Sequence, residues 1–175
     1  MAIDVNNNGR NNLPFVMTGN PETVDDASPY APGQIGSLFS RGSETFQYVK
    51  LDTGATAAAA VAPAANQVVY WKDRDDFLVT NDLAQSAASR NGVAGILRCA
   101  ATAGYYVFIQ KGGLCSVATA GSPAVGDIAV PNSGSAADVT PITAGTAPTY
   151  VQVGVYQTTA TNSVATVDLK LTENV

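Results

Sequence analysis

Residues 104–110 read GYYVFIQ, and this stretch indicates the fold class of the chain. Its side chains alternate between two sets that an extended strand would place on opposite faces, with Tyr105, Val107 and Ile109 on one face and Tyr106, Phe108 and Gln110 on the other. Gly112–Gly113 interrupts the pattern, and residues 114–118 resume it. We therefore expect a strand over 104–110 and a further strand after the two glycines.

Strand-like runs occur on both sides of this stretch. Those toward the N-terminus are residues 46–51 (FQYVKL), 68–72 (VVYWK), 77–80 (FLVT) and 93–99 (VAGILRC). Toward the C-terminus, Val151, Val153 and Val155 share one face of their run, and Ala165, Val167, Leu169 and Leu171 share one face of the last run. Many short strands separated by recurrent Gly, Pro, Ser and Asn turn signals predict an all-β fold, either a sandwich or a barrel.

Two segments have helical character. Residues 55–65 are alanine-rich but contain Pro63, which a helix interior disfavours. Residues 82–90 are compatible with a short helix that begins at Asn81 or Asp82 as its cap.

A charged cluster, Asp73 to Asp76, separates the runs 68–72 and 77–80. Aspartate is a common turn residue, so a polar hairpin turn is the first interpretation. Calcium binding is the second, although the EF-hand pattern is missing. Glycoside hydrolysis would need two carboxyls that converge across a cleft, whereas neighbouring residues of a turn usually diverge into solvent.

The beginning of the chain differs from the rest. It is rich in Asn, Pro and Asp without lasting periodicity, so we divide the chain into an extended N-terminal arm over residues 1–33 and an all-β domain over residues 34–175. One apolar island lies in the arm: Leu13, Pro14, Phe15, Val16 and Met17. The arm is either a solvated tail or a segment that docks this island on a partner subunit. We favour docking, because a solvated tail has no need of Phe15 and Met17.

The composition restricts the classes of function. Charged residues make up 13% of the 175 residues and the net charge is −5, so the basic footprint of a nucleic-acid-binding protein is missing. The chain contains no histidine, which excludes Ser-His-Asp and Cys-His catalysis and most zinc and copper sites. No phosphate-binding glycine loop or nucleophile elbow occurs. We therefore expect no enzyme, no cofactor and no direct contact with nucleic acid, and a weakly charged surface suited to close packing against other proteins.

The two cysteines, Cys99 and Cys115, are too far apart in sequence for a redox or metal-binding pair. Arg98 could lower the pKa of the neighbouring Cys99 thiol, but a histidine base is missing, and we expect both cysteines to act as small buried hydrophobes. The N-terminus lacks a secretory pattern, and the longest apolar run, 55–65, is too short to span a bilayer. We expect assembly in a cytoplasm with reduced thiols and no membrane.

Two aromatic pairs, Tyr70–Trp71 and Tyr105–Tyr106, raise the question of a stacking platform for sugars or bases. Adjacent residues of a strand point to opposite faces, so at most one member of each pair can line such a platform. We expect these rings to pack in the core or at a subunit interface.

The region from about residue 67 to 171 resembles a family of small tailed-bacteriophage head decoration proteins, also called cement proteins. The resemblance is carried by the order of five stretches: VVYWKDRDDFLVTNDLA (68–84), NGVAGIL (91–97), GYYVFIQKGG (104–113), SPAVGDIAVPNSG (122–134) and VQVGVYQ (151–157) with the strand that follows it. It implies a small antiparallel β-barrel or β-tulip-like domain, with no catalytic residues.

The resemblance also implies a homotrimer on the outer surface of the virion. Such trimers bind at three-fold and quasi-three-fold positions and cement neighbouring major capsid proteins. Residues 1–33 match the family pattern poorly, so the grip of the arm on the shell does not follow from it. Another virion β-protein, such as a tail-tube, spike or fibre component, is the alternative, and a small carboxylate-based glycan hydrolase is a more distant one.

Overall fold

The computed structural model describes residues 24–25, 35–52, 62–83, 92–132, 137–146 and 151–171. This part of the chain contains strands and turns but no helix, which confirms the all-β class. The strands are β1 (Val24–Asp25), β2 (Leu38–Arg41), β3 (Glu44–Leu51), β4 (Val68–Asp73), β5 (Leu78–Thr80), β6 (Val93–Leu97), β7 (Tyr106–Ala118), β8 (Ile128–Pro131), β9 (Val139–Ile142), β10 (Gly154–Tyr156) and β11 (Val164–Lys170). The two segments expected to be helical lie largely outside the described residues.

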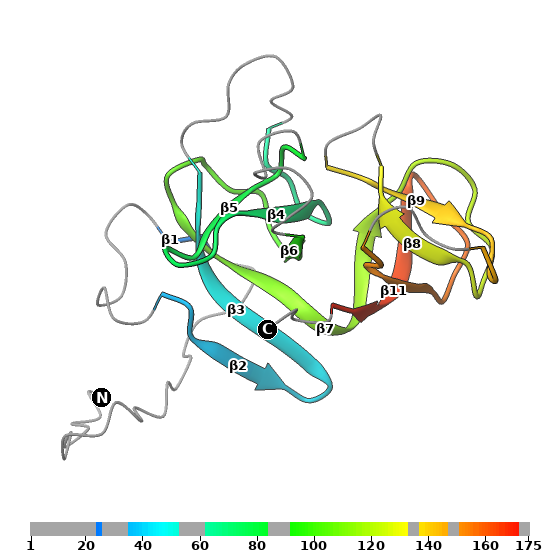
Figure 1. Cartoon of the computed structure of the whole chain (residues 1–175), viewed down its shortest axis with the longest axis horizontal. Coiled ribbons are helices and arrows are strands. Elements are labelled where there is room, and N and C mark those ends of the chain that lie inside the picture. Colours follow the sequence, from blue (N-terminus) through cyan, green and yellow to red (C-terminus); the bar gives the residue numbers. More distant parts are fainter. Residues whose placement is uncertain are drawn as a thin grey trace.

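Five strands close a barrel in the order β3–β5–β4–β6–β7, because β7 pairs with β6 on one side and with β3 on the other (Figure 1). Four of the five pairings in the barrel are antiparallel, as predicted. The fifth, β3 with β5, is parallel and places Lys50 opposite Leu78. The barrel is thus confirmed, with one parallel pair in an otherwise antiparallel ring.

Apolar side chains fill the barrel. The members of this first core are Val49, Leu51, Val69, Trp71, Val79, Ala94, Leu97, Val107 and Ile109. Each large side chain of this kind contributes roughly 1.5–3 kcal/mol when it is fully buried. In β3, β4 and β7 they come from alternate positions, as the period of two along a strand requires, whereas in β6 Ala94 and Leu97 are three residues apart.

The turn between β4 and β5 is the polar hairpin expected at Asp73 to Asp76. Asp73 Oδ1 accepts hydrogen bonds from the backbone N–H groups of Asp75, at 2.9 Å, and Asp76, at 3.3 Å. The aspartate therefore stabilises the reversal of its own chain.

Strand β7 is longer than predicted. The sequence suggests an interruption at Gly112–Gly113, but β7 runs through both glycines and pairs with β11 from Gly112 to Ala118. Gly113 has a φ of +83°, and a Cβ built on it would lie 2.5 Å from the carbonyl oxygen of Ser43. Glycine thus allows the strand to bend where it leaves the barrel, rather than ending it.

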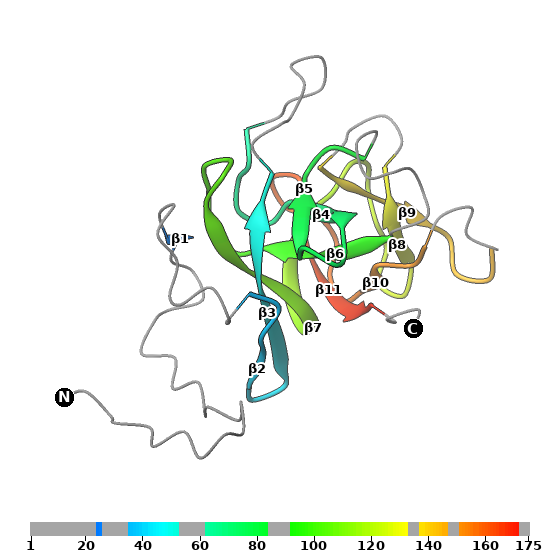
Figure 2. The ribbon, with the colours of Figure 1, turned by 60° about the vertical axis from the view of Figure 1, so that its left-hand side comes forward.

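A second sheet begins with the C-terminal half of β7 and continues in the order β11–β10–β8–β9. An isolated parallel bridge between Thr119 and Val139 brings β9 back beside the chain that follows β7. Figure 2 shows this sheet beside the barrel, joined to it by β7, with β2 and β3 projecting to the other side.

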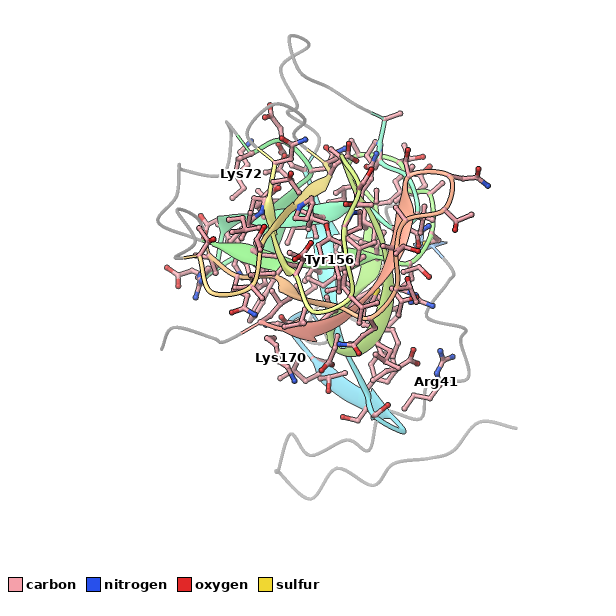
Figure 3. The ribbon with its side chains drawn as sticks, turned by 90° about the vertical axis from the view of Figure 1, so that its right-hand side faces the viewer. Arg41, Lys72, Tyr156 and Lys170 are labelled. Atoms are coloured by element: carbon pink, nitrogen blue, oxygen red, sulfur yellow. The ribbon has the colours of Figure 1, made fainter. Side chains whose placement is uncertain are left out.

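The second core lies between the second sheet and the outer face of β4 and β6. It comprises Val68, Tyr70, Val93, Ile96, Cys115, Val117, Ala129, Val139, Val153, Tyr156, Ala165, Val167 and Leu169. Tyr156 lies deep in this core (Figure 3), and its hydroxyl lies 2.7 Å from Thr119 Oγ1. The two sheets therefore share a core and form one body.

The strand alternation predicted for the two C-terminal runs is found in only one of them. The predicted alternation is confirmed in β11, where Ala165, Val167 and Leu169 are buried. In the preceding run the prediction is wrong, because only Gly154–Tyr156 is a strand, Val153 is fully buried and Val151 is 39% exposed. The chain enters this strand as a loop, so strand periodicity does not apply to Val151.

Candidate functional site

The edge strand β2 forms one wall of the site. Among the described strands it pairs only with β3, with Leu38 opposite Gln47. Phe39 points to the outer face of the barrel and stacks on Phe46, with ring centroids 4.9 Å apart. Leu38, on the other face of the strand, is 56% exposed. The strand is thus fixed along one side and by one face, and its other side and face remain accessible.

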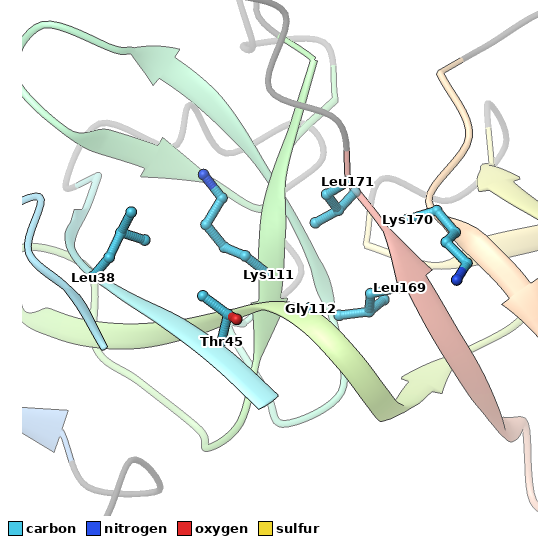
Figure 4. Close-up of a pocket in the computed structure, with 7 residues that line it drawn as sticks. All are labelled: Leu38, Thr45, Lys111, Gly112, Leu169, Lys170 and Leu171. Carbon is cyan, nitrogen blue, oxygen red and sulfur yellow. The ribbon is translucent and has the colours of Figure 1, made fainter. Parts of the chain in front are cut away.

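A hollow of about 430 Å³ opens between β2, β3, β7 and the end of β11. We call it the barrel-mouth hollow, and its lining consists of Leu38, Thr45, Lys111, Gly112, Leu169, Lys170 and Leu171 (Figure 4). Leu38 and Leu171 lie on opposite sides of Lys111 in this view. The three leucines make the hollow apolar, and Thr45 and the lysine stems complete it.

Both lysines of the hollow interact within the chain. Lys111 Nζ donates to Gln47 Oε1 at 3.0 Å and lies 5.5 Å from the centroid of the Trp71 ring. Lys170 Nζ forms an ion pair with Asp168 at 2.8 Å. Among the described residues, no carboxylate or thiol lines the hollow. The described lining therefore favours contact with apolar groups.

Next to the hollow, the fully buried Gln110 fixes the backbone around Gly112. Its Nε2 donates to the backbone carbonyls of Gly112, at 2.9 Å, and Leu114, at 3.0 Å. Its Oε1 accepts from Arg98 at 2.9 Å. One amide group thus satisfies the backbone on both sides of the bend in β7, which keeps Gly112 in a defined position.

The arginine beside the cysteines has a different partner from the one expected. Arg98 donates to Cys115 Sγ at 3.4 Å, although the sequence pointed to an effect on Cys99. Burial raises the pKa of the Cys115 thiol to about 11, and the arginine only partly offsets this rise. Neither cysteine forms a disulfide in the described part of the chain; the buried position is confirmed for Cys115, whereas Cys99 is half-buried.

Tyr70, Trp71 and Tyr106 pack in hydrophobic clusters, as predicted, whereas Tyr105 is half-buried and belongs to none of them. Tyr70 belongs to the second core and Trp71 to the barrel core, so the two rings point to opposite faces of β4. Tyr106 stacks on Tyr48, with centroids 5.8 Å apart, on the outer face of the barrel. Tyr70 Oη is buried and has no hydrogen-bond partner among the described residues, and burial, together with the charge of Asp138, raises its pKa.

The predicted binding residues Leu13, Pro14, Phe15, Val16 and Met17 lie outside the described residues. Of the predicted arm, only β1 is described, and it pairs antiparallel with β7, with Val24 opposite Val107. The arm therefore contacts the barrel of its own chain at this point.

The barrel-mouth hollow is not predicted by the sequence. A signal was present at Leu38 and Phe39, two adjacent large apolar residues that a strand places on opposite faces. That pattern indicates an edge strand with a second apolar contact beyond its own core. The contribution of Leu171 and Lys111 depends on the meeting of strands far apart in the sequence, for which there is no local signal.

Within the described part of the chain, no group of three or more Cys, Asp or Glu side chains is placed to hold a metal ion. No helix in that part is long and apolar enough to cross a membrane. No family model matches the sequence, and no curated protein matches it.

Proposed function

We propose that this chain is a structural virion protein that binds the outer surface of a tailed-phage capsid and cements neighbouring major capsid proteins. The observation that carries the proposal is the barrel-mouth hollow beside the open edge of β2. It offers apolar contact and backbone hydrogen bonding, which suit the binding of a protein segment. Its described lining holds two lysines, both engaged within the chain, and no carboxylate or thiol, which supports a structural role over catalysis.

The character of the surface supports this role. The large hydrophobic residues that are exposed in the described part of the chain are Leu38, Leu114, Val125 and Val151. Only 13% of all residues are charged. Exposed apolar groups on a weakly charged surface favour contact with other proteins.

The construction of the fold also suits a clamp. Strand β7 belongs to both sheets, and the second core packs against the outside of the barrel. Close-packed cores resist deformation and transmit strain. A load applied to one sheet is therefore passed to the other, as a cement between two capsid subunits requires.

A homotrimer at three-fold and quasi-three-fold sites is part of the proposal. Closed three-fold symmetry matches the axis that such a protein would occupy. A trimer that binds a fixed lattice gains effective concentration for its second and third contacts, so each contact can be weak. The arm residues Leu13 to Met17 would add a contact with the shell, after assembly in the host cytoplasm.

Sedimentation of the protein, alone and mixed with capsids that lack it, tests the proposal. We expect a species of three times the 17.9 kDa chain mass that saturates capsid sites. Phe15→Ala should weaken capsid binding while leaving the fold intact. Failure of the protein to co-sediment with capsids would contradict the proposal. Self-assembly of the protein into tubes or fibres would favour a tail component instead.

A further inference from the structure

The barrel-mouth hollow has the shape of a site for one added strand. The free edge of β2 can bind an extended segment through backbone hydrogen bonds. Leu38, on the face of β2 away from the aromatic cluster of Phe39 and Phe46, would then lie beside the added segment. Alternate side chains of that segment would enter the hollow toward Leu169 and Leu171.

We propose that the occupant is the segment Leu13 to Met17 of the same chain. In an extended conformation Leu13, Phe15 and Met17 share one face, and three apolar side chains match the three leucines of the hollow. Pro14 lacks an N–H and is tolerated only in a strand with one unpaired side. A segment added outside β2 would be such an edge strand.

The direction of the chain supports docking within one molecule. Strand β1 is antiparallel to β7, with Val24 opposite Val107 and Asp25 opposite Tyr106. Backward from Val24 the chain points toward the Gly112 end of β7, which lines the hollow, but β6 pairs with β7 at Ile109 and Gln110, so the segment must leave the edge of β7 soon after β1. The segment therefore leaves β1 in the direction of the hollow, and it must reach the hollow by passing over the strands rather than along the edge of β7.

The available length is sufficient. From Val107 to Gly112 the distance along β7 is about 17 Å, and crossing from the position of β1 to a strand added outside β2 is four strand spacings, at most roughly 19 Å sideways. These combine to a span of roughly 26 Å. Nine residues separate Phe15 from Val24, and they reach about 30 Å when extended. A tether of this length also gives the segment a millimolar effective concentration at its own hollow, which favours it over a second copy.

The inference goes beyond the proposed function and does not depend on it. It assigns a resting position to the apolar island in the free protein, where the island covers Leu38 and the neighbouring leucines. If the island also binds a capsid, it must first leave this hollow. Capsid binding and self-docking would then compete for one segment.

Photo-crosslinking of the free full-length protein tests the inference. Phe15 is replaced by p-benzoylphenylalanine, and these chains are refolded together with unmodified chains that carry ¹⁵N. We expect crosslinks to residues 38–45, 111–112 or 169–171 in which both peptides are unlabelled. Crosslinks mainly to labelled peptides would show that the segment docks on a neighbouring copy. Crosslinks to other residues would show that the segment does not dock in the hollow. Either result overturns the inference.

Two leucines provide a matched pair of variants. Leu38 and Leu114 are both 56% exposed, but only Leu38 lines the hollow. Leu38→Glu should lower the crosslink yield at least tenfold, whereas Leu114→Glu should change it less than twofold. Equal effects of the two substitutions would contradict the inference.

Hydrogen exchange provides a second test, with a substitution in the arm that leaves the sequence of the barrel unchanged. Phe15→Ser should raise the rate of amide hydrogen exchange in β2 at least fivefold, because the added strand protects that edge. Unchanged exchange in β2 would contradict docking on this strand, whatever the outcome of the Leu38 variant. Because neither measurement uses capsids, a negative result leaves the capsid proposal intact.

Discussion

Gln110 Nε2 donates to the carbonyl oxygen of Leu114 at 3.0 Å, across the bend at which β7 passes from the barrel to the second sheet. The same nitrogen donates to the carbonyl of Gly112. A single buried side chain therefore supplies the hydrogen bonds that the backbone loses where the strand bends. The run Gln110 to Gly113 thus has a physical explanation: the amide satisfies the bend and the glycines permit it.

Gln110→Leu should destabilise the protein by about 2–4 kcal/mol. The substitution leaves two backbone carbonyls and the Arg98 guanidinium without their amide partner in a buried position. Urea unfolding followed by circular dichroism measures the change. Gln157→Leu is the control, because this exposed side chain makes a single 3.3 Å hydrogen bond, and its loss should change stability by less than about 0.5 kcal/mol. Similar losses in the two variants would show that the bend does not depend on the amide.

Gly113→Ala should destabilise the protein more than Gly145→Ala does. Both glycines have a positive φ, +83° and +90°, so alanine is strained at each by roughly 1–2 kcal/mol. At Gly113 the added Cβ would also meet the Ser43 carbonyl at 2.5 Å, whereas nothing lies within 4 Å of a Cβ at Gly145. The difference in unfolding free energy between the two variants isolates the steric contribution. Equal losses of stability in the two variants would mean that the backbone at Ser43 moves away from the added Cβ without an energetic cost.

Two buried tyrosines should respond in opposite ways to the loss of the hydroxyl. Tyr156→Phe removes the 2.7 Å hydrogen bond with Thr119 and should cost about 1–1.5 kcal/mol. Tyr70→Phe should be neutral or stabilising, because Tyr70 Oη has no partner among the described residues and its burial is unfavourable. Thermal and urea unfolding of the two variants test the contrast. A substantial loss in Tyr70→Phe would reveal a partner for that hydroxyl.

Stability should be flat near neutral pH and fall in alkaline solution. The chain has no histidine to titrate between pH 6 and 8. Burial raises the pKa of Cys115 from 9.0 to about 11 and that of Tyr156 from 10.0 to about 12. Above pH 9 the unfolded chain releases these protons before the folded chain does. The stabilisation is therefore complete below pH 9 and is lost as the pH rises through 11 and 12, by up to about 1.4 kcal/mol per pH unit for each group.

Urea unfolding at intervals from pH 6 to 11 measures this dependence. Cys115→Ala should flatten the decline between pH 9 and 11, whereas Cys99→Ala, at the half-buried thiol, should leave most of it. The comparison uses the slope with pH rather than the absolute stability, which the cavity at Cys115 also lowers. An unfolding transition between pH 6 and 8 would contradict the expectation.

The strands were predictable where alternation is regular and the turns are polar. The residues of β11 and the hairpin at Asp73 to Asp76 lie where the sequence predicted them. The prediction failed at Gly112–Gly113, because a glycine pair can bend a strand as well as end it. It also failed at Val151, because a loop residue carries no information about the faces of a strand.

The all-β fold class and the weakly charged surface follow from the sequence by itself. The period of two, the turn residues and the composition are local properties that need no knowledge of the partner strands. Only the tertiary structure decided that β3 pairs in parallel with β5, that β7 serves two sheets and that Leu38 meets Leu171 across a hollow. These contacts join residues far apart in the chain, and many pairings are compatible with the same local pattern. The selection among them depends on packing of the two cores as a whole, which no single segment encodes.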